Sequence, residues 1–203
     1  YKDMTVALEA FKAGEYDFIY ENHSKRWARD YSGPNFDNGV IIKRQLKHSN
    51  NTGIQGFVFN TRKEIFQNRE IRKAITLAFD FKWSNDNLFY NQYERCDSYF
   101  SNSELSASIV PSDNEVMLAK KLGINLNRLK NKEHNFIVNN NIRDNLIEAK
   151  KIFDKLGFKV VNNKLFSPQG KKVEFSFLLA QKGFERILAP FAMNLKKLGI
   201  TLN

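Results

Sequence analysis

The sequence predicts an α/β domain, and three observations support this fold class. Amphipathic helical stripes recur from one end of the chain to the other, and short apolar stretches of β-strand character lie between them. The 203 residues include 42% apolar residues and 18 phenylalanines, which is enough to build a core. No run approaches the roughly 20 apolar residues that a membrane span requires.

The helices are predicted from apolar residues that recur at spacings of three and four. Asp3 and Gly14 delimit the first helix as N-cap and C-terminal residue. Ser112 with Glu115 forms a capping box, and Gly157 ends the clearest stripe. The expected helices cover residues 4–13, 21–31, 68–79, a stretch after Asp80 that carries Trp83, Leu88 and Phe89, and residues 112–122, 142–156 and 184–198.

Strands are expected where apolar residues alternate or form short runs between turn residues. They cover residues 16–20, 39–47, 54–60, 158–165 and 173–179, and residues 200–202 begin another. Residues 48–53 are typical of a hairpin loop, Gly33-Pro34 breaks the second helix, and residues 167–170 form a turn. Residues 90–111 are expected to form an ordered loop. Residues 125–141, rich in Asn and Lys, are expected to be the most mobile stretch.

The net charge raises the possibility of an anionic partner. Lys and Arg number 32 against 22 Asp and Glu, which gives +10. A nucleic-acid face needs its cations gathered on one element, whereas these are spread along the whole chain. A solvated basic surface is the favoured interpretation, and a nucleic-acid or anionic-surface binding domain is the alternative.

The residues that usually signal catalysis or metal binding are missing from the pattern. The three histidines are far apart, Cys96 is the single cysteine, and neither glycine-rich phosphate motif occurs. Arg95 beside Cys96 could activate the thiol, but an unreactive small residue is the simpler interpretation. The sequence therefore predicts a protein that is not an enzyme and has no cofactor and no metal site.

Three segments, in this order, resemble one family. They are ALEAFKAGEYD at residues 7–17; GFVFNTR and FQNREIRKAITLAFD at residues 56–62 and 66–80; and EAKKIFDKLG with the helix ending NLKKLGITL at residues 148–157 and 194–202. They are similar to extracellular solute-binding proteins of peptide ABC transporters, the cluster that binds oligopeptides, dipeptides or nickel. NLFYNQY and SYFSNSEL at residues 87–93 and 98–105 resemble its Yej-type branch, which is associated with uptake of peptides and peptide antibiotics.

The resemblance implies a fold and a function. Members of this family have two lobes around a cleft and are at least twice this size, so the chain would be a fragment. Residues 1–31 would be the tail of the first lobe, residues 32–53 the crossing and start of the second, and residues 54–203 the second lobe before the return strand. The implied fold is an incomplete type II periplasmic-binding-protein lobe, a mixed sheet flanked by helices. The implied protein captures oligopeptides or peptide-like compounds in the periplasm for an inner-membrane ABC permease, without chemistry and without nucleic acid.

The candidate ligand-binding residues are inferred from the chemistry and position of their side chains and not from the family resemblance. A peptide offers amides and charged ends, which call for aromatic walls and charged donors on loops near strand ends. Trp27, flanked by Lys25 and Arg26, lies near the expected crossing, and the aperiodic loop adds aromatic, cationic and amide groups. Packing beneath the loop for each ring, and an ordinary surface charge for each arginine, are the competing interpretations. The candidates are Arg26, Trp27, Tyr93, Arg95, Tyr99 and Asn102.

Cleft and crossing surfaces left without their lobe would be apolar contact sites, so we expect this 203-residue chain to self-associate. Sedimentation velocity over a concentration series should show dimers or larger species as concentration rises. A strict monomer at high concentration would contradict this expectation.

Overall fold

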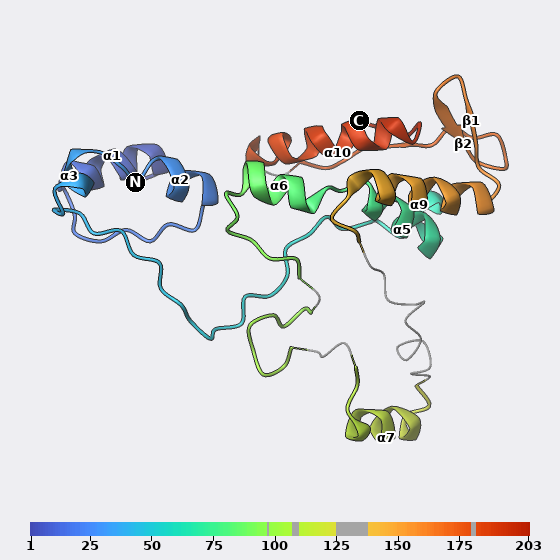
Figure 1. The fold of residues 1–203 in the computed structure, drawn as a ribbon, viewed down its shortest axis with the longest axis horizontal. Helices are drawn as coiled ribbons and strands as arrows, with labels where there is room; N and C mark the ends of the chain where they lie inside the picture. Colours follow the sequence, from blue (N-terminus) through green and yellow to red (C-terminus); the bar gives the residue numbers. More distant parts are fainter. Residues whose placement is uncertain (97, 107–109, 125–137, 180–181) are drawn as a thin grey trace. The chain divides into compact units, whose positions relative to one another are not determined.

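The computed structural model describes residues 1–96, 98–106, 110–124, 138–179 and 182–203. The chain divides into two compact units (Figure 1). Unit 1 contains residues 1–49 and 85–94, and unit 2 contains residues 50–84 and 95–203. The predicted mobile stretch falls mostly on residues 125–137, which lie outside the described residues.

Unit 1 is helical. Its helices are α1 (Met4–Lys12), α2 (Ser24–Arg29) and α3 (Pro34–Asp37). Both predicted ends of α1 are confirmed: the Asp3 carboxylate accepts from two amides of the first turn, and Gly14 follows the helix at φ 79°. A small core of Leu8, Phe11 and Tyr31 joins α1 to the segment after α2.

Unit 2 holds the main core. Its elements are α4 (Glu64–Gln67), α5 (Arg69–Leu77), α7 (Asp113–Lys121), α9 (Ile142–Lys155), β1 (Lys159–Val161), β2 (Lys164–Phe166), β3 (Glu174–Phe175), η2 (Lys182–Phe184), α10 (Glu185–Lys197) and β4 (Thr201–Leu202). A further helix, α6 (Phe81–Leu88), begins in unit 2 and ends in unit 1.

The core of unit 2 forms where α5 and α9 lie side by side, as Figure 1 shows. Ala74 and Ile75 of α5 are fully buried, as are Ala149 and Phe153 of α9. These are residues of the predicted stripes, and the predicted capping box of Ser112 with Glu115 is also present at α7. The helices expected from local pattern are therefore confirmed, although several are shorter than predicted.

An aromatic cluster extends this core toward α10. The Phe57 ring makes edge-on contacts with Phe79 and Phe177, at centroid distances of 5.6 and 4.9 Å. It also lies 6.1 Å from Phe191 of α10. Aromatic pairs in this geometry add stability beyond the area that they bury. Buried Asn194 reinforces the junction by donating to the Ala78 carbonyl at 3.1 Å.

Two small sheets complete unit 2. β1 pairs with β2 in antiparallel register, and β3 pairs with β4 in parallel register. Backbone bonds connect the sheets to each other. The Leu165 amide donates to the Gly199 carbonyl at 2.8 Å, and the Val173 amide donates to the Leu165 carbonyl at 2.8 Å.

Three of the predicted strands are wrong, because the structure has no β-strand at these positions. Residues 16–20, 39–47 and 54–60 form no ladder in the part of the chain that the structure describes. An apolar run becomes a strand only where another strand supplies hydrogen-bond partners. The alternation in the third run is nevertheless real, because Phe57 and Phe59 pack on the core while Val58 is 94% exposed.

The predicted single strand at residues 158–165 is also wrong, because it is a hairpin. Asn162 and Asn163 connect β1 to β2, and both have positive φ, 49° and 60°. A two-residue turn with positive φ at both positions matches the twist of the flanking strands. The predicted turn at residues 167–170 is present, and the Gly170 amide donates to the Ser167 carbonyl at 2.8 Å.

No described helix combines the length and the apolar composition needed to cross a bilayer.

Gly199 is the position where a side chain would do most damage. Its φ is +79°, and an added Cβ would lie 2.7 Å from the Leu165 amide nitrogen. We expect Gly199→Ala to lower the free energy of unfolding by about 2–5 kcal/mol, because left-handed strain adds to a backbone clash. Urea denaturation followed by circular dichroism measures the change.

Gly170→Ala is the matched control. Gly170 has a similar φ of +75°, but its added Cβ would meet no heavy atom within 4 Å. Only the conformational cost of about 1–2 kcal/mol should remain. Equal losses in the two variants would show that the approach of Leu165 to Gly199 does not matter.

Candidate functional site

The six candidate ligand residues are divided between the two units. Arg26, Trp27 and Tyr93 belong to unit 1, and Arg95, Tyr99 and Asn102 belong to unit 2.

In unit 1, the segment 85–94 is attached to α2. The Gln92 side chain donates from Nε2 to the Ser24 carbonyl at 3.2 Å. The guanidinium of Arg29 lies 5.4 Å from the centre of the Tyr90 ring. The structure thus brings the two sequence regions that carry the candidates Trp27 and Tyr93 into one unit.

Arg26 is held by a buried carboxylate. Its Nη2 donates to Glu21 Oε1 at 3.3 Å, and its Nε lies 2.8 Å from Oε2 without hydrogen-bond alignment. Glu21 also accepts from the His23 amide at 2.6 Å and from the Tyr31 hydroxyl at 3.2 Å. Burial, with the nearby Glu21 charge, raises the pKa of Tyr31 well above its ordinary value. The Arg26 charge is thus balanced inside unit 1.

Trp27 contacts both an aromatic ring and a cation. The Trp27 ring centre is 5.8 Å from the Tyr31 ring centre, and the Lys43 ammonium lies 4.4 Å from the centre of the Trp27 ring. Lys43 also donates to the Trp27 carbonyl, and its partial desolvation lowers its pKa. Sequence reasoning missed Lys43, because nothing local in the sequence points from residue 43 back to residue 27.

Tyr93 is positioned by α6 and the residue after it. Its backbone amide and carbonyl both bond the Asn85 side chain, at 3.2 and 2.8 Å, and its ring packs edge-on against Phe89 with centroids 4.8 Å apart. The side chain remains 38% exposed. Its backbone is thus fixed while part of the ring faces solvent.

Arg95 in unit 2 stacks on an aromatic ring. Its guanidinium lies 5.6 Å from the centre of the Phe81 ring. Desolvation lowers the pKa of Arg95, but an arginine keeps its charge at neutral pH. A guanidinium held on a ring keeps its outward N–H groups available for a carboxylate.

Tyr99 and Asn102 lie in a serine-rich turn that is hydrogen-bonded to residues 50–52. Asn102 donates from Nδ2 to the Asn50 carbonyl at 2.9 Å, and the Thr52 amide donates to the Ser101 carbonyl at 3.0 Å. The Ser98 hydroxyl accepts from the Phe100 amide at 3.1 Å. Tyr99, by contrast, is 75% exposed. The turn therefore presents its tyrosine outward while Asn102 holds the backbone.

The candidates offer aromatic contact and positive charge, which suits binding rather than chemistry. In the described ranges, no three His, Cys, Asp or Glu side chains gather as a metal site would require. Cys96 is an exposed thiol.

The whole chain, residues 1–203, matches the sequence profile described as bacterial extracellular solute-binding proteins, family 5 Middle. The chain belongs to family 5 of the bacterial extracellular solute-binding proteins. This membership confirms the resemblance found in the sequence, and the curated relatives confirm its Yej-type branch.

Two relatives of this family 5 chain are called YejA. Uncharacterized protein YejA of Escherichia coli (strain K12) is 35% identical over 208 residues, covering 100% of this chain and 34% of that protein. Probable peptide-binding protein YejA of Agrobacterium fabrum is 35% identical over 207 residues, covering 98% and 34%. The family 5 chain thus spans about a third of the length of these relatives.

Solved structures support the fold of this family 5 chain. One is the oligopeptide-binding protein AppA from Bacillus subtilis in complex with a nonapeptide, with a TM-score of 0.57 at 19% sequence identity. The match covers 99% of this chain and 34% of the AppA chain. The periplasmic EDTA-binding protein EppA has a TM-score of 0.60 at 17% sequence identity, and the match covers 100% of this chain and 34% of the EppA chain. The predicted fold class, an incomplete lobe of the periplasmic-binding-protein type, is confirmed.

The Glu21 carboxylate, 2% exposed, organises the residues around Arg26. We expect Glu21→Gln to destabilise unit 1 by about 1–3 kcal/mol, because the amide keeps the shape but not the charge that Arg26 and the His23 amide face. Trp27 fluorescence during urea unfolding, in a Trp83→Phe background, measures the loss.

Glu9→Gln is the control, since Glu9 pairs with Lys12 at 3.0 Å on an exposed surface of the same unit. Its effect should stay within about 0.5 kcal/mol. An equally small effect of Glu21→Gln would argue against an organising role for Glu21.

Proposed function

We propose that the protein to which this chain belongs captures oligopeptides or peptide-like compounds in the periplasm and delivers them to an inner-membrane ABC permease. The observation that carries the proposal is the family 5 match over all 203 residues. It is supported by a relative named as a probable peptide-binding protein and by a fold neighbour in complex with a nonapeptide. Its work is binding without catalysis.

The chain would supply part of the ligand site. Trp27, Tyr93 and Tyr99 offer partly exposed or exposed rings, and Arg95 offers a desolvated guanidinium. Rings give apolar contact to peptides of different sequence, and their hydroxyls can bond a peptide backbone. We assign Arg26 and Asn102 a supporting part in the site, since both already hold neighbouring backbone or side chains.

The lobe arrangement belongs to the same proposal. Residues 1–31 would be the tail of the first lobe, residues 32–53 the crossing and the start of the second lobe, and residues 54–203 the second lobe. Two lobes that close on a ligand are the usual device of such binding proteins.

An anionic-surface or nucleic-acid binder is the alternative that the +10 charge suggests. Nothing in the family match or the neighbours favours it. Binding to nucleic acid would weaken steeply as salt rises, because counterions are released, whereas capture in a largely apolar cleft would not.

The test is the double substitution Tyr93→Ala with Arg95→Ala in the full-length protein. We expect peptide affinity to fall by about 1.5–4 kcal/mol, from a lost aromatic contact and a lost charge-assisted bond. The peptide is one selected from a random library by retention on the wild-type protein, and titration calorimetry gives its affinity. The melting temperature of the ligand-free protein should barely move.

Tyr20→Ala with Arg69→Ala is the matched control, since it removes an exposed tyrosine and an exposed arginine elsewhere. It should leave peptide affinity within about twofold of wild type. Unchanged affinity in the Tyr93 and Arg95 variant, or collapse of its unliganded stability, would show that these side chains are structural. A wild-type protein that retains no peptide would contradict the proposed function itself.

A further inference from the structure

One face of unit 2 carries two adjoining hollows that the proposed peptide site does not use. The first, of about 330 Å³, lies between α9 and the end of α10, and the second, of about 510 Å³, lies between α10 and the β1–β2 hairpin. Lys197 lines both. We call this surface the α9–α10 face; its lining residues are Ile142, Arg143, Leu146, Ile147, Lys150, Val160, Asn163, Met193, Lys196, Lys197, Leu198 and Gly199.

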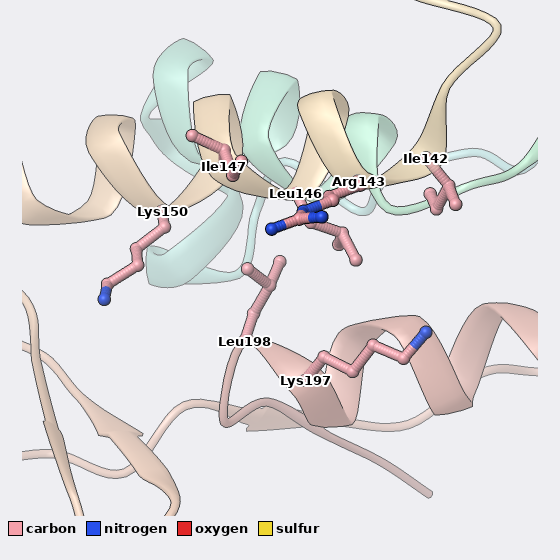
Figure 2. A pocket seen from close by; sticks show the side chains of 7 residues that line it. All are labelled: Ile142, Arg143, Leu146, Ile147, Lys150, Lys197 and Leu198. Carbon is pink, nitrogen blue, oxygen red and sulfur yellow. The ribbon is translucent and has the colours of Figure 1, made fainter.

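The floor of the first hollow is apolar. Figure 2 shows Leu198 extending from the end of α10 toward α9, where Leu146 lies. Exposed apolar side chains line both hollows: Ile147 in the first is 47% exposed, and Val160 and Met193 in the second are 51% and 67% exposed. Apolar residues gathered around a hollow, rather than scattered singly, mark an interaction site.

The charged groups of the face all have one sign. Arg143, Lys150, Lys196 and Lys197 line the hollows, and no carboxylate among the described residues does. Within the same described ranges, Arg143, Lys150 and Lys196 form no ion pair, and Lys197 donates to the neutral Asn194 amide at 3.1 Å. Four cations so placed favour an acidic occupant.

We propose that the α9–α10 face docks an acidic segment of a partner protein, with apolar side chains of that segment seated in the two hollows. The charge dictates the acidic character, and the apolar floor dictates the seated side chains. A bilayer surface fits less well, because membrane insertion requires protruding apolar groups, whereas these apolar groups surround concave hollows.

None of the six candidate ligand residues lines either hollow, so docking and peptide capture can be separated by mutation. The inference rests on the proposed function for the identity of the probe, which is the membrane-embedded part of the protein's ABC transporter. That part is placed in phosphatidylcholine nanodiscs, so that the lipid carries no net charge.

The variant is Lys150→Glu with Lys197→Glu in the full-length protein, and biolayer interferometry measures its binding to the nanodiscs. We expect affinity to fall at least tenfold, with a shallower salt dependence than wild type. Lys120→Glu with Lys121→Glu on α7 makes the same charge change on exposed lysines and should alter affinity less than twofold. Peptide affinity and melting temperature should be unchanged in both variants.

Several results would overturn the inference. Unchanged docking, or equal weakening in the α7 control, would show that the face is not the contact. Tight binding of wild type to phosphatidylglycerol vesicles alone, lost in the Lys150 and Lys197 variant, would assign the face to lipid. A protein that binds peptide but not the transporter nanodiscs would refute docking while leaving peptide capture intact.

A labelling experiment checks that the face is open. In a full-length background with every native cysteine, Cys96 included, replaced by serine, Ile147→Cys should react with maleimide, and transporter nanodiscs should protect it. Met117→Cys on α7, where the native side chain is 63% exposed, is the control and should react with or without nanodiscs. An Ile147→Cys variant that never reacts would show that the protein's own chain covers the face, and the inference would fall.

Discussion

The architecture of unit 2 depends on how closely two backbones approach at Gly199. The Gly199 carbonyl accepts from the Leu165 amide, the Leu165 carbonyl accepts from the Val173 amide, and the Val173 carbonyl accepts from the Thr201 amide. These hydrogen bonds connect the hairpin β1–β2 to the parallel pair β3–β4. Only a residue without a side chain permits that approach, because a Cβ at Gly199 would lie 2.7 Å from the Leu165 nitrogen.

Helices were predictable from the sequence because their causes are local. The apolar spacing of Ile71, Ala74 and Ile75 and the capping pair Ser112 and Glu115 are complete within a few residues. Strands are different, because a run such as residues 39–47 has the composition of a strand but needs a second strand to pair with. The sequence of the run does not show whether that second strand exists. The Asn162-Asn163 turn was a local signal that the sequence did contain, and two asparagines can adopt the left-handed conformation that it requires.

The candidate site was predictable in composition but not in pairing. That an aperiodic loop would present Tyr93, Arg95 and Tyr99 followed from their density in the sequence, and the side chains are indeed at least partly exposed. The partners Glu21 of Arg26 and Lys43 of Trp27 required the fold, because turns bring them together. The cations of the α9–α10 face come from two helices that are distant in sequence, so no local motif announced them.

The aromatic core also determines the order in which the chain can fold. The Asn194–Ala78 hydrogen bond joins residues that are 116 positions apart in the sequence. The contacts of Phe57 and Phe79 with Phe191 likewise cannot form until Phe191, just before Asn194, has been synthesised. Closing such long loops is slow, so these contacts form late. At a synthesis rate of about 5–20 residues per second, Phe57 and Phe79 can contact each other but lack Phe191 for about 6–27 s while the ribosome adds the intervening residues. During that time the nascent chain displays an aromatic surface suited to chaperone recognition.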